Sequence, residues 1–216
     1  EVDNALRDTG VDVLILAASE VMMSALTNEM PNRLEDIVFD TVRMESVVSP
    51  EEKIEQTIPL AEKAERQREQ DSVDRLKSAI GQGGIGASGA SEVVRKLQNG
   101  QVDTLVLSDT FEGDGWADYE MHLYGVDNLP TTHPAGGDVS KLVKVELHDE
   151  LVRLALISGA EVDVIHSAVP ADEDTEVRDA GEEMPQTDAS RDLEELGGVG
   201  AILRYSMTGD AEPETI

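Results

Sequence analysis

Residues 196–205 of this 216-residue chain have the sequence Leu-Gly-Gly-Val-Gly-Ala-Ile-Leu-Arg-Tyr. A charged turn, residues 192–196, precedes the glycine pair, and an apolar run follows it. Glycine adopts the left-handed conformation that ends a helix without the strain that a side chain would add. The stretch therefore predicts a short helix that ends at the glycines and a buried strand directly after it.

The same order of glycine and apolar run occurs three more times in the chain. Gly10, Gly100 and Gly159 precede apolar runs at residues 11–17, 102–107 and 162–165, respectively. Repeated alternation of helix, glycine and buried strand is typical of α/β proteins, whose strands are covered by helices on both faces. We expect two α/β/α bodies built on parallel-type strands.

A long helix is predicted between the two bodies. Ser49-Pro50-Glu51-Glu52 combines a serine cap, a proline at the first helical position and a glutamate that closes a capping box. The helix should continue to about residue 80, and its charged middle, residues 61–75, should be solvated. We therefore place the domain boundary near its end, with one domain at residues 1–80 and the other at residues 81–216.

The remaining elements follow from local pattern. In the first domain we expect a helix from Ser19 to about residue 29 and a strand over residues 34–43. In the second we expect helices over residues 91–98 and 146–158. The segments 109–140 and 168–190 should be irregular, and residues 206–216 a frayed tail.

Charge is the outstanding bulk property of the chain. It has 46 acidic and 17 basic residues, a formal net charge of −29, and six lysines against eleven arginines. The acids are spread over the whole length, and the regular pattern argues against disorder. Adaptation to a salt-rich cytoplasm accounts for this balance, because salt screens the self-repulsion. In such a host, acidity does not exclude RNA partners.

Composition also limits the chemistry. The chain has no cysteine, which excludes disulfides, thiolate catalysis and cysteine-type zinc sites. No apolar run approaches the roughly 18 residues that a membrane helix needs. The first residue is not methionine, so we expect the chain to be part of a longer, cytoplasmic protein.

The glycine cluster Gly81–Gly89 contains the pattern G-x-G-x-x-G and is the candidate nucleotide site. That pattern should follow a buried strand, whereas here it follows a charged helix. A hinge that leads into a short strand is the better interpretation.

Metal and catalytic signals are weak. His122, His133, His148 and His166 have no metal-site spacing, and His148 should lie on the exposed flank of a helix. The acidic run 172–174 lacks the fixed spacing of a calcium loop. No Gly-x-Ser-x-Gly elbow or Ser/His/Asp arrangement stands out. We therefore assign no catalytic, cofactor-binding or metal-binding residue.

Five segments resemble a known family. Residues 91–108 have the sequence Ser-Glu-Val-Val-Arg-Lys-Leu-Gln-Asn-Gly-Gln-Val-Asp-Thr-Leu-Val-Leu-Ser. This is similar to the helix "Val-x-x-Ala-Leu-x-x-Gly" and strand "Val-x-x-Leu-Leu-Ile-Ser" of the archaeal and eukaryotic class-1 peptide-chain release factors. Residues 147–162 and 197–205 resemble a later helix and the last strand of that family's C-terminal domain. Residues 10–17 and the long helix resemble the end of its central domain, and the chain looks closest to the family's prokaryotic relatives.

The resemblance implies a C-terminal domain with the fold of small RNA-binding ribosomal proteins. The family's Gly-Gly-Gln loop has no counterpart here, because Gly81-Gln82-Gly83-Gly84 is a different sequence in a different place. Some relatives carry a Cys-Pro-x-Cys zinc element where this chain has Thr132-His133-Pro134-Ala135. No catalytic residue or metal ligand is therefore carried over.

We expect a ribosome-associated protein of translation termination or of the rescue of stalled ribosomes, with ribosomal RNA and translation factors as partners and no DNA or membrane partner. This chain would be a binding and positioning module and not an enzyme. Two alternatives stay open: an enzyme that binds a nucleotide or small molecule at Gly81–Gly89, and a stress-related protein–protein module.

Overall fold

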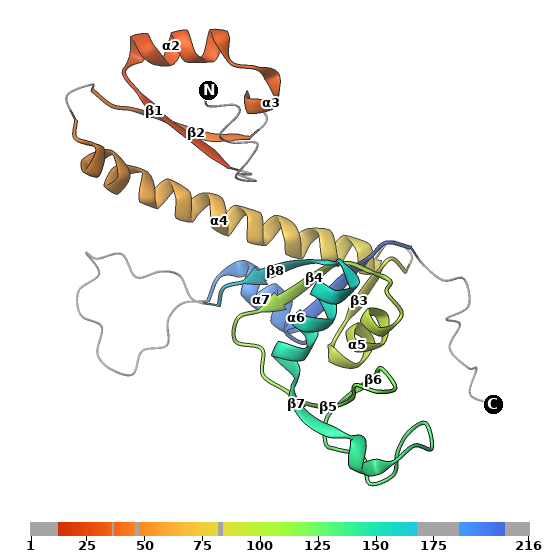
Figure 1. Ribbon diagram of the computed structural model, residues 1–216. Coiled ribbons are helices and arrows are strands. Elements are labelled where there is room, and N and C mark those ends of the chain that lie inside the picture. Colours follow the sequence, from red (N-terminus) through yellow and green to blue (C-terminus); the bar gives the residue numbers. More distant parts are fainter. Residues whose placement is uncertain (1–12, 36, 46–47, 82–83, 168–185, 206–216) are drawn as a thin grey trace, which may run out of the picture. The chain divides into compact units, whose positions relative to one another are not determined.

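The computed structural model describes residues 13–35, 37–45, 48–81, 84–167 and 186–205. By packing, the chain divides into two compact units, residues 1–68 and 69–216 (Figure 1). The division falls within helix α4 (Pro50–Gly81), whose C-terminal part packs with the second unit. The domain boundary near residue 80, placed at the end of the long helix, stays a prediction.

The first unit contains a two-stranded parallel sheet. Its elements are β1 (Leu14–Ala18), α2 (Glu20–Glu29), α3 (Asn32–Glu35), β2 (Val38–Arg43) and the N-terminal part of α4. The prediction of a single strand over residues 34–43 is wrong at its start. The carbonyl of Pro31 accepts the amide N–H groups of Leu34 and Glu35, so a short helix forms before the strand begins.

The start of α4 is as its sequence predicts. The amide N–H of Glu52 donates to the hydroxyl of Ser49 at 3.2 Å, and the amide N–H of Ser49 donates to the Glu52 carboxylate at 3.0 Å. This reciprocal pair satisfies amide groups that have no partner within the helix.

The second unit has a four-stranded sheet at its centre. The strands are β3 (Gly86–Ser88), β4 (Val102–Ser108), β8 (Glu161–Ile165) and β9 (Val199–Leu203), in the order β3-β9-β4-β8. β4 and β8 are parallel, whereas β9 is antiparallel to both of its neighbours. The expectation of parallel strands throughout is therefore wrong for β9. A continuous apolar run indicates that a strand is buried, but it carries no information about its direction.

Helices cover both faces of this sheet, so the predicted three-layer α/β/α arrangement is confirmed for the second unit (Figure 1). On one face α5 (Ala90–Gln98) and α6 (Leu147–Ser158) pack through Leu97 and Leu151 onto Leu105 of β4. On the other face α4 and α7 (Asp188–Glu195) pack through Leu76 and Leu193.

A second, smaller sheet lies within residues 109–146, which we call the small-sheet segment. It contains β5 (Asp114–Asp118), β6 (Leu123–Val126), the 3₁₀ turn η1 (Val139–Lys141) and β7 (Val143–Glu146). The strands are antiparallel in the order β6-β5-β7. The prediction of irregular structure over residues 109–140 is therefore wrong, and the helix expected from residue 146 begins at Leu147.

Glycine residues within these strands explain why the sequence pattern did not predict this sheet. Gly125 of β6 is directly opposite Trp116 of β5. A Cβ atom on Gly125 would lie 2.3 Å from the indole ring, so the glycine leaves the space that the ring occupies. Such strands lack the alternation of apolar and polar residues that marks a half-buried strand.

Two sequence predictions fall wholly or partly outside the described residues. The predicted frayed tail, residues 206–216, lies outside them, as does most of the segment 168–190. The last residues of that segment are described, and α7 begins at Asp188, so the loop prediction is wrong there.

Among the described helices, none combines the length and the apolar character needed to span a membrane.

Candidate functional site

The described residues of the glycine cluster Gly81–Gly89, which are all of it except 82 and 83, do not form a phosphate-binding loop. Most of its glycines precede β3, whereas a dinucleotide loop follows its strand. The amide N–H of Ser88 donates to the Glu92 carboxylate at 3.4 Å, and that of Gly89 donates to the carbonyl of Val199 at 2.9 Å. These amide groups are already used, and the Glu92 carboxylate would repel a phosphate. The predicted short strand is confirmed as β3, whereas the hinge stays a prediction, and the cluster lies within the second unit and not between the two units.

The four histidines lie in separate environments. His122 borders the groove described below, and His133 is buried. His148 lies on the exposed flank of α6, with its Nδ1 3.2 Å from Asp149, as predicted. His166 follows β8, and its Nδ1 lies 2.6 Å from the buried carboxylate of Glu69 on α4. In the described part of the chain, no three His, Asp or Glu side chains are placed to hold a metal ion. The acidic run 172–174 lies outside that part.

An acidic cleft of about 660 Å³ lies where β4 ends and α6 begins. Phe111, Gly113 and His148 line it together with five acidic residues, Asp109, Glu112, Asp114, Glu146 and Asp149. The carboxyl end of β4 is where an α/β sheet would place a ligand. Five carboxylates at this edge disfavour an anionic ligand such as a nucleotide.

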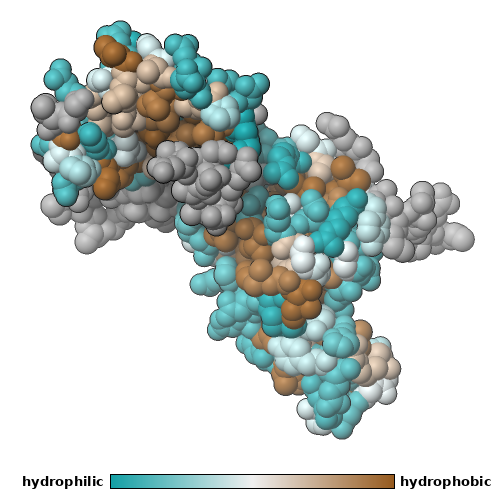
Figure 2. All heavy atoms as spheres, turned by 45° about the horizontal axis from the view of Figure 1, so that its top comes forward, coloured by the Kyte–Doolittle hydropathy of each residue, from teal (hydrophilic) through white to brown (hydrophobic). Residues whose placement is uncertain are grey.

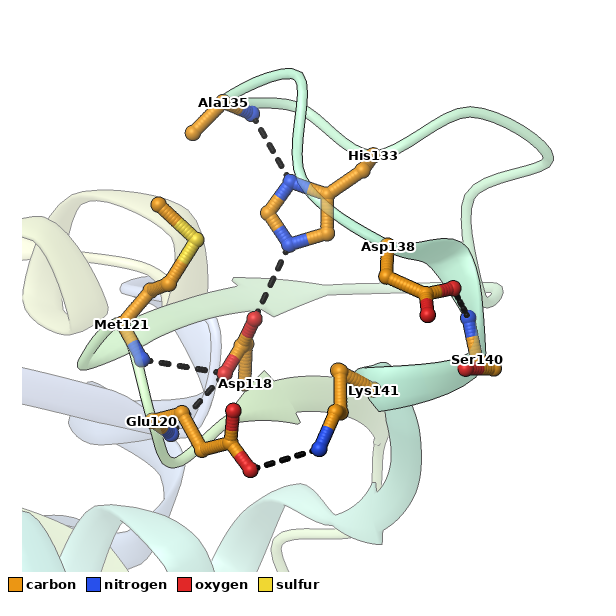
Figure 3. Close-up of polar contacts among 8 residues, drawn as sticks. All are labelled: Asp118, Glu120, Met121, His133, Ala135, Asp138, Ser140 and Lys141. Carbon is orange, nitrogen blue, oxygen red and sulfur yellow. Dashed lines mark hydrogen bonds and ion pairs between the residues drawn. The ribbon is translucent and has the colours of Figure 1, made fainter.

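A buried Asp118–His133 pair lies at the centre of the small-sheet segment (Figure 3). Asp118 Oδ2 is 2.9 Å from His133 Nε2, and the two side chains are 2% and 1% exposed. Asp118 Oδ1 accepts the amide N–H groups of Glu120 at 2.8 Å and Met121 at 3.0 Å. Hydrogen bonds from His133 and from these two amides hold the pKa of Asp118 below its ordinary value.

Two more polar contacts shape the tip of this segment (Figure 3). The Asp138 carboxylate accepts the amide N–H of Ser140 at 2.9 Å and caps η1, which lowers the pKa of Asp138. The Lys141 ammonium lies 2.6 Å from the Glu120 carboxylate, which raises the pKa of Lys141. The turn after β5 is thus tied to the turn before β7.

Arg153 and two tyrosines join the small-sheet segment to α6. The Arg153 guanidinium donates to both carboxylate oxygens of Glu150 and lies 5.1 and 5.4 Å from the ring centres of Tyr119 and Tyr124. The Tyr119 hydroxyl donates to Glu150 at 3.1 Å. The hydrogen bonds that Arg153 donates to Glu150 hold the pKa of Arg153 above its ordinary value, and burial together with the Glu150 charge raises the pKa of Tyr119. The Gln98 side chain exchanges two hydrogen bonds of 3.1 Å with the backbone of Tyr124.

A groove of about 470 Å³ opens beside this cluster. Its lining includes Tyr119, His122, Arg153 and Ile157 and contains no carboxylate, and the Ile157 side chain is 70% exposed. Aromatic, aliphatic and arginine side chains together are typical of protein-binding hot spots. The lining of this groove therefore suits the binding of a protein partner. Its described residues do not include a nucleophile paired with a base.

Sequence analysis did not single out Asp118, Tyr119 or Arg153. Asp118 is 15 residues from His133 in the chain, and no motif links the two positions. The only local signal for the groove was the pair of tyrosines, Tyr119 and Tyr124, in a chain with few aromatic residues.

Comparison with known proteins gives one sequence relative and several similar structures. No family model matches the chain. It is 27% identical to peptide chain release factor subunit 1 of Thermococcus onnurineus (strain NA1) over 149 residues, which are 62% of this chain and 32% of that protein.

Among solved structures, archaeal Pelota in a model of ribosome-bound Pelota and ABCE1 matches 95% of this chain and 46% of its own, with a TM-score of 0.57 and 17% identity. Archaeoglobus fulgidus Pelota matches 96% of this chain and 53% of its own, at 20% identity and a TM-score of 0.46. The chain thus spans about a third of the curated relative and about half of these two structures. The sequence match confirms the resemblance to the release factors, and the first structure shows the shared fold.

Proposed function

We propose that this relative of the archaeal peptide chain release factors is a ribosome-associated protein of translation termination or of the rescue of stalled ribosomes. The observation that carries the proposal is the 27% identity to release factor subunit 1 over 149 residues. The fold supports it, because α4 runs between two compact units and the second unit is an α/β/α layer structure. Both features fit the order of segments that the family resemblance predicts.

Within that function, we assign this chain to binding and positioning. Its sequence contains no Gly-Gly-Gln, the tripeptide of the family's hydrolytic loop. The groove beside Arg153 and the acidic cleft offer surfaces for recognition, and neither pairs a nucleophile with a base. The partners would be the ribosome or its RNA and other translation factors, in the cytoplasm.

Ribosome co-sedimentation tests this function. The chain is incubated with ribosomes of its own host, or of an archaeon with a salt-rich cytoplasm, at molar KCl and centrifuged through sucrose. We expect it in the ribosomal pellet, and the same chain without ribosomes serves as the control for aggregation. If the chain stays in the supernatant at every salt concentration, the proposal fails.

We further propose that the chain is adapted to high salt. The excess of 46 acidic over 17 basic residues supports this, because salt must screen the repulsion among them. We expect the melting temperature to rise steeply between dilute buffer and molar KCl. Full stability in dilute buffer would contradict the proposed adaptation to high salt. It would not bear on the proposed ribosomal role.

A nucleotide-binding enzyme loses support, because the Glu92 carboxylate lies at the start of α5, where it would repel a phosphate, and because the amides of Ser88 and Gly89 are already bonded to Glu92 and to the carbonyl of Val199. A thermal-shift panel of nucleotides tests this alternative, since a ligand of the folded state stabilises it by mass action. We expect no shift with any nucleotide. A shift that is lost on substitution of Gly89 would restore the alternative.

A further inference from the structure

The small-sheet segment contains the stretch 132–135, where some relatives of the release factors carry a zinc element. A structural zinc site takes four cysteine or histidine ligands in tetrahedral geometry. This chain has no cysteine, and His133 is the only histidine of the stretch. Over the described residues, no group of three His, Asp or Glu side chains could hold a metal ion. The residues of this segment therefore do not fit zinc.

Both ring nitrogens of His133 are already engaged (Figure 3). The amide N–H of Ala135 donates to Nδ1 at 3.1 Å, so Nδ1 carries no proton in the neutral ring. The ring proton is then on Nε2, which donates to Asp118 Oδ2 at 2.9 Å. A metal ion on either nitrogen would displace one of these hydrogen bonds.

Asp118 extends the connection to a second turn. Its other oxygen accepts the amide N–H groups of Glu120 and Met121, directly after β5. The carboxylate therefore links the turn at residues 118–121 to the loop at residues 132–135. Tyr119 lies within that turn, and its hydroxyl donates to Glu150 of α6.

We propose that the Asp118–His133 pair is a metal-free lock that takes the place of a zinc site in the small-sheet segment. The Ala135 amide at Nδ1 and the Asp118 carboxylate at Nε2 together fix the ring proton of His133 on Nε2, and the pair links the two turns of the segment and positions Tyr119 beside Arg153. The folding of this segment is then independent of zinc. The inference concerns this chain's own packing, so it stands or fails separately from ribosome binding.

Substitution and metal analysis test the lock together. Asp118→Ala and His133→Ala should each lower the melting temperature by about 4 °C or more, because each leaves a buried polar group without its partner. The double variant should lose about as much as either single one, since the two residues act as a pair.

Asp118→Asn should behave like the alanine variant. An asparagine that keeps its oxygen on the two amide groups turns its NH₂ toward the Nε2–H of His133, so two donors face each other. The matched control is His148→Ala, whose pair with Asp149 is exposed. We expect it to change the melting temperature by no more than about 1 °C.

Two measurements on the unchanged protein remain informative if a variant does not fold. A long-range ¹H–¹⁵N spectrum should show His133 protonated at Nε2 and unprotonated at Nδ1. After expression with added zinc, the purified chain should carry no stoichiometric zinc, and EDTA should leave its melting temperature unchanged. One bound zinc per chain, a fall in melting temperature with EDTA, protonation at Nδ1, or additive effects of the two alanine substitutions would overturn the proposal.

Discussion

At the scale of single residues, the fold of the small-sheet segment depends on a few buried hydrogen bonds. Each of them contributes more to stability than an exposed ion pair on the surface does. Most ion pairs of the described residues, such as Lys144–Asp114, are solvent-exposed and contribute little. The Asp118–His133 pair is almost completely buried, so the loss of one partner leaves a buried polar atom of the other, Asp118 Oδ2 or His133 Nε2, without its hydrogen bond.

The lowered pKa of Asp118 predicts a dependence of stability on pH. A carboxylate whose pKa is lower in the folded than in the unfolded state stabilises the fold fully above the unfolded value, about 3.9. That contribution is lost as the pH falls through the folded value. We therefore expect the difference in unfolding free energy between wild type and Asp118→Ala to be constant from pH 7 to about pH 5 and to shrink below about pH 4.

Urea unfolding of both proteins at a series of pH values measures this difference. The other carboxylates titrate in both proteins, so their contributions cancel in the comparison and the change below pH 5 reports on Asp118. A difference that persists unchanged to pH 3 would contradict the expectation.

Gly125 predicts a spectroscopic effect. A Cβ at this position would lie 2.3 Å from the Trp116 ring, the only indole in the chain. Gly125→Ala should therefore displace the ring, change its fluorescence maximum and lower the stability. Gly81→Ala is the matched control, because nothing lies within 4 Å of a Cβ there. Unchanged emission from Gly125→Ala would show that the ring and strand have room to adjust.

At the scale of elements, α4 has two different environments along one continuous helix. In its N-terminal part, Ile54 and Ile58 are 62% and 48% exposed, whereas Val73 and Leu76 in its C-terminal part are fully buried. The buried part contacts Val106 of β4 and Leu193 of α7 within one core cluster. The stability of the second unit thus depends on the end of a helix that begins in the first.

Substitutions along α4 should show this difference. Leu76→Ala should lower the unfolding free energy of the second unit by about 2–5 kcal/mol, because it leaves a cavity in a packed core. Ile58→Ala should change it by less than about 0.5 kcal/mol. Urea unfolding followed by circular dichroism at molar KCl measures both values, and equal losses for the two variants would contradict the environments described here.

At the scale of the whole molecule, the two units differ in the amount of apolar core they possess. The described residues of the first unit include three buried apolar side chains, Leu34, Met44 and Ala64. The second unit has two large clusters, one on each face of its sheet. On the face drawn in Figure 2, the coloured residues form hydrophilic areas with separate hydrophobic patches between them.

We expect two thermal transitions, with the first unit unfolding at the lower temperature because it buries less apolar surface. Leu34→Ala should lower only the first transition, and Leu151→Ala only the second. Differential scanning calorimetry at molar KCl measures both. A single transition that both variants lower equally would show that the units unfold together.

Local chemistry in the sequence determined the layers and many element boundaries. Ser49 and Glu52 start α4 by capping its amide groups, and Gly159 ends α6 in the left-handed conformation. Apolar runs after glycine predicted the buried strands β4 and β9, because burial on both faces requires apolar side chains throughout. These signals act within a few residues, so they can be recognised without knowing the fold.

The tertiary structure alone decided which distant groups meet. The direction of β9, the pairing of Trp116 with Gly125 and the partner of His133 depend on segments brought together by folding. A histidine pattern does not reveal whether an aspartate 15 residues away will accept a hydrogen bond from the ring. Helix caps and burial are local properties of the chain, whereas strand pairing and buried hydrogen bonds are properties of its packing.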